Sequence, residues 1–129
     1  MIVLDTHAWL WWIQGNTVDL PDAVKQRIDA SDTVSVSAVS CLEVAWLEKK
    51  RRIALPLPIT DFLKLALEGS RIGLLPLTPT IAARSAALPE IHRDPIDRII
   101  IATAIEHSAE LISRDRIFTR YPDVRVQWA

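Results

Sequence analysis

The sequence predicts an α/β fold, a three-layer α/β/α sandwich built around a central, mostly parallel sheet. Short apolar runs rich in β-branched residues alternate along the chain with longer segments of helical spacing, a pattern typical of parallel strands covered by helices on both faces. Of the 129 residues, 50% are apolar, and the chain contains no repeat, low-complexity tract or change of composition. We therefore expect one domain over residues 1–129.

The first strand is expected over residues 2–4, an apolar run too short for a helix, and it ends at Asp5. An apolar helix over residues 6–13 follows, and Gly15 suits the left-handed turn that ends a helix. The next helix, over residues 21–30, carries apolar side chains on one face and charged side chains on the other, as expected of a surface helix.

The second strand is expected over residues 33–37, where β-branched and polar residues alternate. Glu43 falls in the first turns of the helix that follows. Ser40 and Glu43 fit a capping box, in which the glutamate only closes a backbone N–H, whereas a cap at Ser37 leaves the Glu43 carboxylate free. The basic run at residues 49–52 suits a solvated helix C-terminus and, as an alternative, contact with RNA.

The middle of the chain predicts a helix, a strand and a second helix. Thr60 is the expected cap of the first helix, and Gly69 ends it. A strand is expected over residues 74–77. The second helix opens at residues 78–79, where a threonine precedes a proline, and extends to about residue 88.

The last part of the chain opens with an almost wholly apolar helix. Asp94 is its expected N-cap, a proline occupies its first position, and Asp97 lies in its first turn. A buried strand over residues 111–113 follows, with Asp115 just past its end. A final strand over residues 124–128 is expected at the edge of the sheet.

Four acids are expected to converge at one edge of this sheet. Asp5 and Asp115 follow strands, whereas Glu43 and Asp97 lie near the starts of helices entered from the same edge. In open parallel sheets, ligands bind outside the carboxyl ends of the strands. The alternatives are local, because Asp97 can merely compensate the helix dipole and Glu43 can merely close a capping box.

Such a cluster predicts a metal site. Carboxylates in a partly dry cleft repel one another, and a divalent cation removes the conflict. Oxygen ligands without cysteine or histidine support suit Mg²⁺ or Mn²⁺, and the implied reaction is hydrolysis of a phosphodiester bond. Thr6 and Ser113, each beside an acid, could hydrogen-bond a ligand carboxylate or serve as local caps.

Composition argues against other classes of site. Cys41 is the only cysteine, so no intramolecular disulfide can form, and a Cys/His zinc site is not expected. With three glycines and no G-x-S-x-G sequence, the chain offers neither a phosphate-binding loop nor a serine nucleophile. An aspartyl-phosphate mechanism lacks a second nearby aspartate. The chain shows no apolar run of ~18 residues and no signal peptide, so we expect a cytoplasmic protein with no membrane contact.

Four ordered motifs resemble those of PIN-domain proteins, and within them the VapC-like toxins. They are residues 1–8 (MIVLDTHA), 37–45 (SAVSCLEVA), 92–104 (HRDPIDRIIIATA) and 113–115 (SRD). The resemblance spans essentially the full chain. It implies a metal-dependent ribonuclease, the toxin of a type II toxin–antitoxin pair, with an α/β/α fold and usually a dimeric state. The departures from the family pattern are Cys41 with Leu42 before the glutamate and the basic run at residues 49–52, and neither removes an acid.

The resemblance also implies roles for individual residues. By position, the catalytic and metal-binding acids of the family fall on Asp5, Glu43, Asp97 and Asp115. Near these acids, three arginines could hold RNA phosphates or form salt bridges: Arg98, Arg114 and Arg116.

An antitoxin partner is implied as well, with a C-terminal segment that lies across an apolar groove. Four tryptophans could line that groove, although a core or dimer contact explains each equally well: Trp9, Trp11, Trp12 and Trp46. Two other functions fit the sequence, a regulatory protein-binding module with weak or no catalysis, and a nuclease that acts on DNA or on structured RNA.

Overall fold

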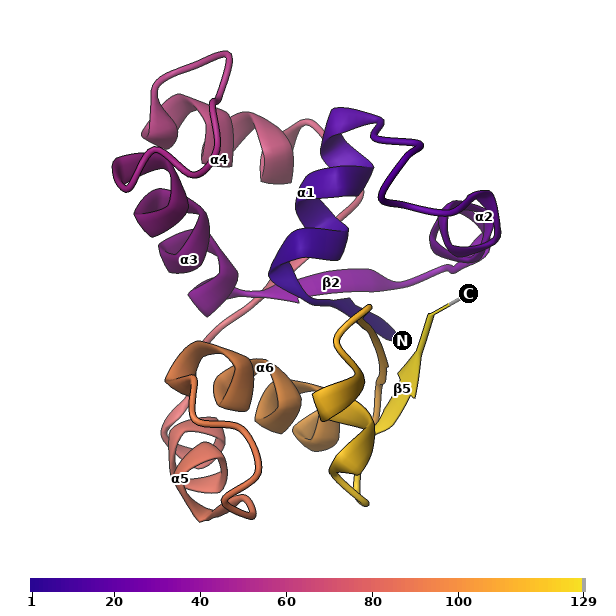
Figure 1. Ribbon diagram of the computed structural model, residues 1–129, viewed down its shortest axis with the longest axis vertical. Helices are drawn as coiled ribbons and strands as arrows, with labels where there is room; N and C mark the ends of the chain where they lie inside the picture. The colour runs from indigo at the N-terminus through magenta and orange to yellow at the C-terminus, as the bar shows by residue number, and fades with distance from the viewer. Residues whose placement is uncertain (129) are drawn as a thin grey trace.

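A computed structural model describes residues 1–128, whose central layer is a five-stranded parallel sheet (Figure 1). In chain order the strands are β1 (Ile2–Leu4), β2 (Val34–Ser37), β3 (Gly73–Leu75), β4 (Glu110–Ile112) and β5 (Arg125–Gln127). Their order in the sheet is β3-β2-β1-β4-β5, and every neighbouring pair is parallel. In the central strand, Ile2 is in register with Val34 on one side and Glu110 on the other.

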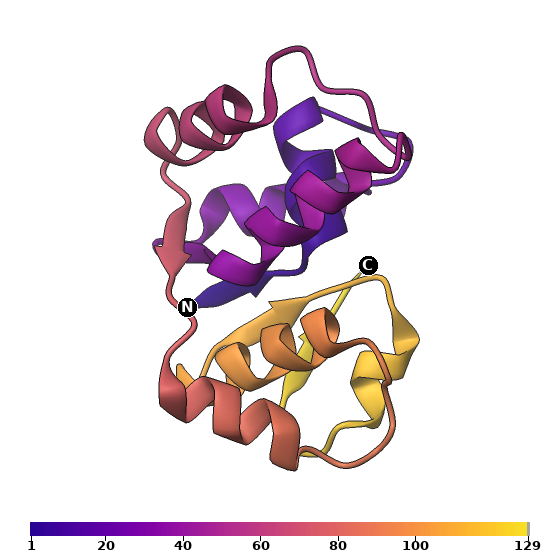
Figure 2. The ribbon, with the colours of Figure 1, turned by 90° about the vertical axis from the view of Figure 1, so that its left-hand side faces the viewer.

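Helices form the two outer layers, as the sequence predicts. One layer contains α1 (Thr6–Gln14), α2 (Asp22–Ala30), α3 (Ala38–Lys49) and α4 (Ile59–Glu68). The other contains α5 (Pro79–Ala87), α6 (Pro95–Glu106) and a short 3-10 helix, η1 (Arg116–Arg120), which the sequence did not indicate. Figure 2 shows these two layers above and below the sheet. The predicted α/β/α sandwich is confirmed.

The apolar core lies on both faces of the sheet because side chains of a strand alternate between faces. Ile2 and Leu4 belong to the cluster under α1 to α4, whereas Val3 between them belongs to the cluster under α5 and α6. Helix α6 is buried along most of its length, in line with its apolar sequence. No helix among residues 1–128 combines the length and the apolar character needed to cross a membrane.

The structure decides between the two caps predicted for α3 and corrects the cap predicted for α4. The Ser37 side chain caps α3 and accepts a hydrogen bond from the backbone N of Val39, so the capping box with Ser40 is wrong and Glu43 is not held by it. Helix α4 begins at Ile59, directly after Pro58, so Thr60 lies inside the helix instead of capping it. Helix α6 starts as predicted, with Asp94 as its cap.

The strand order reverses next to β1. From β1 the chain builds β2 and β3 on one side, and then returns to place β4 and β5 on the other side. A reversal of this kind leaves a crevice outside the carboxyl ends of the two strands that flank it. Here those strands are β1 and β4, which Asp5 and Ser113 follow directly.

Candidate metal centre

Asp5 is fixed at the carboxyl end of β1 by contacts with both neighbouring elements. Its backbone N donates to the carbonyl of Ile112 at 3.1 Å, which ties it to β4. As N-cap of α1, its Oδ1 accepts from the backbone N of Ala8 at 2.9 Å, while its Oδ2 accepts from the Ser113 hydroxyl at 2.5 Å. Asp5 is 9% exposed, and this burial raises its pKa against the lowering effect of the two hydrogen bonds.

Asp97 lies at the centre of the acidic cluster. Proline in the first position of α6 and the cap at Asp94, whose Oδ1 accepts from the N of Ile96 at 2.9 Å, place Asp97 in the first turn. Its carboxyl belongs to two groups of potential ligands whose atoms lie within 4.8 Å of one another. One group adds Glu43 and Asp94, and the other adds His92 and Asp115.

The environment of Asp97 strongly favours its neutral form in the absence of a metal. Burial is the largest cause, and it raises the pKa of the carboxyl to about 8 together with four negative neighbours. These neighbours, in decreasing order of effect, are Asp94, Glu43, Asp5 and Asp115. All the acids therefore act on one carboxyl, the situation in which a cation is most stabilising.

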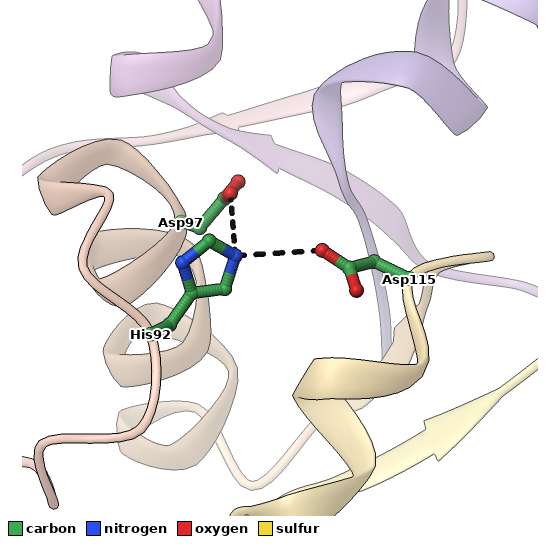
Figure 3. Close-up of side chains that lie close together, drawn as sticks. All are labelled: His92, Asp97 and Asp115. Atoms are coloured by element: carbon green, nitrogen blue, oxygen red, sulfur yellow. Dashed lines mark hydrogen bonds and ion pairs between the residues drawn. The ribbon is translucent and has the colours of Figure 1, made fainter.

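His92 joins the cluster from the loop between α5 and α6. Its Nδ1 accepts from the backbone N of Asp94 at 3.2 Å. Its Nε2 lies 3.0 Å from Oδ2 of Asp97 and 3.4 Å from Oδ2 of Asp115 (Figure 3). The ring also packs on Phe118 of η1 at 5.6 Å between centroids, and both ring nitrogens are thus used.

Asp115 is positioned by the turn that follows β4. Its Oδ1 caps η1 by accepting from the N of Ile117 at 2.9 Å, and its own backbone N donates to the Ser113 hydroxyl oxygen at 3.0 Å. Because the same hydroxyl donates to Asp5, Ser113 links two acids of the cluster. Glu43 approaches from α3 with a half-buried side chain.

Comparison with known proteins is consistent with this geometry. The family model of the PIN domain matches residues 2–124. The chain belongs to the PIN domain family. Ribonuclease VapC22 from Mycobacterium tuberculosis is 39% identical over 117 residues, which cover 89% of this chain and 87% of that protein. The resemblance to VapC-like proteins, predicted from four motifs, is confirmed.

Solved structures agree with the PIN fold. A toxin–antitoxin complex from Klebsiella pneumoniae contains a chain that is 27% identical, with a TM-score of 0.69 over 96% of this chain and 95% of that one. The crystal structure of VapBC2 from Rickettsia felis, bound to a DNA fragment from their promoter, matches with a TM-score of 0.74 over 100% of both chains. At 18% identity, this second likeness concerns the fold alone.

In this PIN domain, the structure gathers the other three predicted acids around Asp97 and adds two residues that the sequence analysis missed as site members. Asp94 was assigned only as a cap, and His92 was given no individual role. The available signal was spacing: His92 precedes the cap by two residues, so its ring can reach the backbone N of Asp94. Thr6 donates to Ser40 Oγ at 2.9 Å, and no hydrogen bond joins it to the acids among residues 1–128.

The arginines divide into one structural and two surface residues. Arg98 is 8% exposed, and its guanidinium donates to carbonyl oxygens at the end of α5 and in the following loop, those of Ser85, Ala86, Leu88, Pro89 and His92. These contacts argue against the predicted contact of Arg98 with RNA phosphates, and the guanidinium lies 3.9 Å from the Glu90 carboxylate, in line with the salt-bridge alternative. Arg114 lies over the Trp11 ring at 4.5 Å and 3.5 Å from Asp19, and Arg116 is exposed.

The predicted tryptophan groove is corrected in part. Trp9 is fully buried in the core, so it cannot line a groove. Trp11 is half-buried against Trp128. Trp12 lines an apolar hollow between α1 and α4, whereas Trp46 lines a different hollow beside the acids.

The donor set fits a hard divalent cation. Carboxylate oxygens are the ligands that Mg²⁺ and Mn²⁺ prefer, and one or two carboxylates with substrate oxygens complete their coordination. The acids of both groups around Asp97 offer such oxygens, and the single imidazole is already hydrogen-bonded on both nitrogens. Burial, followed by the negative charge of the neighbouring acids, raises the pKa of Asp97, and a bound cation would offset both effects.

Proposed function

We propose that this chain is a Mg²⁺- or Mn²⁺-dependent endoribonuclease and the toxin of a type II toxin–antitoxin pair. The observation that carries the proposal is the position of the Asp97 carboxyl, which lies within 4.8 Å of ligand atoms of Glu43 and Asp94 and also of His92 and Asp115. The family, and a 39% identical relative named as a ribonuclease, support RNA as the substrate.

The residues of the cluster have different roles in this proposal. The ion would be held by Asp5, Glu43, Asp97 and Asp115, and it would activate water and stabilise negative charge on the phosphate. Ser113 orients the Asp5 carboxylate through its 2.5 Å hydrogen bond. The Glu43 carboxylate accepts no side-chain hydrogen bond within residues 1–128, so both of its oxygens are free to hold the ion or a water molecule on it.

The partner we propose is an antitoxin whose apolar segment binds between α1 and α4. A hollow of about 400 Å³ lies there, and its lining includes Trp12, Phe62, Leu65 and Ala66. The related solved structures support this choice because they are described as toxin–antitoxin or VapBC complexes. We also propose a homodimer, which would cover the exposed Leu74 of edge strand β3 and the nearby Leu77.

The deciding experiment is cleavage by purified, partner-free protein. Structured RNAs, single-stranded RNA and single-stranded DNA are incubated with Mg²⁺, Mn²⁺ or EDTA, beside the matched variants Asp5→Asn and Asp97→Asn. We expect metal-dependent RNA cleavage that both variants lose, which also excludes contaminating nucleases. Folded, metal-binding protein that cleaves none of the RNAs would contradict the proposal and favour a protein-binding module, and preferential DNA cleavage would change the substrate.

A further inference from the structure

A second hollow lies directly beside the acidic cluster. Its volume is about 390 Å³, within the range of pockets that hold small ligands. Two acids of the cluster, Glu43 and Asp94, are part of its lining. The rest of the lining contains an aromatic ring, Trp46, and two cations, Lys50 and Arg52.

Helix α3 arranges these chemical groups in a row. Glu43, Trp46 and Lys50 are three and four residues apart, so they share one face of the helix. Along the helix axis, the Cα atom of Trp46 lies about 4.5 Å beyond that of Glu43, and the Cα atom of Lys50, at the C-cap, lies about 6 Å further on. Moving along α3 from the metal centre, a bound chain would therefore meet an acid, an aromatic ring and a cation in that order.

The end of α3 adds the second cation to the hollow. Arg51 adopts a left-handed conformation with φ 59°, and the backbone N of Arg52 donates to the carbonyl of Leu47 at 2.9 Å. Together with the bond from Arg51 N to Glu48 at 3.0 Å, this is a Schellman turn, which folds the chain back on the helix. None of the four cations at residues 49–52 pairs with a carboxylate within residues 1–128.

The Trp46 indole is accessible to a ligand. It is 45% exposed, and the only cations over its ring are Lys49 at 5.2 Å and Lys50 at 5.4 Å, as far as residues 1–128 are concerned. An exposed cation–π contact is weaker than the stacking of a nucleobase on an aromatic side chain. A base can therefore displace the flexible lysines, which become available to phosphate oxygens.

We propose that this hollow binds the nucleotide next to the scissile phosphate of a single-stranded RNA, with its base on Trp46 and its outer phosphate on Lys50 and Arg52. The inference rests on the proposed ribonuclease function, which would place the scissile phosphate at the acids. Charge distinguishes this occupant from an apolar protein segment. Among residues 1–128, the lining of the hollow beside Trp12 contains no charged side chain. The hollow beside Trp46 also has two apolar side chains, Leu47 and Ile96, but it adds an aromatic ring between the acids on one side of the lining and two cations without a carboxylate partner in the described part of the chain.

The test separates binding from cleavage. A short fluorescein-labelled single-stranded RNA of random sequence is titrated with the full chain carrying Asp5→Asn, and its anisotropy gives the affinity. Added Trp46→Leu should weaken binding about tenfold, because leucine is apolar but offers no ring for stacking, and Trp46→Phe should recover part of the loss. Lys50→Gln and Arg52→Gln should each weaken binding a few-fold and lower its salt dependence. Lys64→Gln, an exposed cation on α4, is the charge-matched control and should change nothing.

A second readout locates the base. RNA should quench tryptophan fluorescence in the Asp5→Asn protein and much less in the same protein with Trp46→Phe, which keeps the other tryptophans. The proposal would be overturned if Trp46→Phe left the quenching unchanged, or if folded Trp46→Leu and Lys50→Gln proteins bound RNA as tightly as the Asp5→Asn parent. Either result would leave the hollow to a protein segment.

Cleavage assays distinguish failure of this inference from failure of the proposed function. If the wild-type chain binds RNA through Trp46 but cleaves none, the subsite is retained and the ribonuclease proposal is contradicted. If wild type and Trp46→Leu cleave RNA with the same kcat/KM, the ribonuclease function is retained and the subsite is overturned.

Discussion

The Nε2 atom of His92 lies 3.0 Å from a carboxyl oxygen of Asp97, the central acid of the metal centre (Figure 3). Because Nδ1 of the same ring accepts from the backbone N of Asp94, a neutral ring carries its proton on Nε2. His92 thus donates to Asp97. The ring is held in turn by its backbone, whose N donates to the Tyr121 hydroxyl at 2.8 Å and whose carbonyl accepts from Arg98 at 3.2 Å.

Replacement of His92 should separate positioning from packing. His92→Phe keeps the contact with Phe118 but removes the donor to Asp97, so metal affinity and cleavage should fall about tenfold or more, as for other partners of metal ligands. His92→Gln places an amide donor near the position of Nε2 and should recover most of the affinity. Mn²⁺ titration followed by electron paramagnetic resonance measures this directly. Equal affinities in wild type and His92→Phe would show that the ring serves only packing.

Metal binding should release protons near neutral pH. The pKa of Asp97 is raised to about 8 without metal, first by burial and then by its acidic neighbours, so much of this carboxyl is protonated at pH 7. A cation must displace that proton, and affinity for Mn²⁺ should rise as the pH increases toward 8. Calorimetry in buffers of different ionisation enthalpy counts the protons. Asp97→Asn should bind more weakly and release fewer.

The same carboxyl predicts a pH dependence of folding in EDTA. The pKa of Asp97 is higher in the folded state than in the unfolded state, so between these two values the folded state keeps a proton that the unfolded state has lost. The contribution of Asp97 to the free energy of unfolding is therefore complete below about pH 4 and is lost as the pH rises through about 8. Asp97→Asn removes the dependence. Urea unfolding should therefore show a variant more stable than wild type at pH 8 and a difference that shrinks toward pH 4. A constant difference would place the origin elsewhere.

Ser113 should contribute to both stability and metal binding. Its hydroxyl is the 2.5 Å donor to a nearly buried carboxylate, Asp5, and a hydrogen bond to a charged group is worth roughly 1.5–3 kcal/mol. Ser113→Ala should lower the free energy of unfolding by about 2 kcal/mol and weaken Mn²⁺ binding. Ser35→Ala removes a buried hydroxyl of β2 and is the matched control. In a double-mutant cycle with Asp5→Asn, an absence of coupling would contradict this role.

The acids of the centre were predictable because strand ends obey a simple rule. Asp5 and Asp115 follow parallel strands, and Asp97 follows a capped helix start, so their convergence needs only the order of elements. The role of His92 was not predictable in this way. It depends on a loop closed by Arg98 and by Tyr121, which lies 29 residues further along the chain.

Two further errors have one physical cause, the burial of helices on more faces than a local pattern reveals. Arg98 neighbours Asp97 in sequence, but adjacent residues of a helix point in different directions, and the face of Arg98 is covered by α5 and its loop. Trp9 belongs to the same buried cluster as Ile2 and Leu4 of β1, whereas Trp12 is half-buried. Similarly, both Ser37 and Ser40 fit the N-cap of α3 in the sequence. Only the structure shows that β2 ends at Ser37, which then caps the helix.

Arg98 should affect stability before it affects RNA binding. Its guanidinium satisfies several carbonyl oxygens that no single ammonium group can reach, so Arg98→Lys should cost about 2–3 kcal/mol of unfolding free energy. Arg116→Lys, at an exposed position, should stay within about 0.5 kcal/mol of wild type. Chemical denaturation measures both. If Arg98→Lys were as stable as wild type but had lost RNA affinity, the result would support the phosphate contact that the structure argues against.

Arg51 gives a prediction in the opposite direction, a gain of stability. It occupies the left-handed position of the turn after α3, with φ 59°, where a side chain costs roughly 1 kcal/mol and glycine is preferred. Arg51→Gly should raise the free energy of unfolding by up to about 1 kcal/mol, less the greater freedom of glycine in the unfolded chain. Because Arg51 does not line the hollow beside Trp46, RNA affinity should change little. A more stable variant that has lost RNA affinity would instead show that the strained position is retained for the cation it presents.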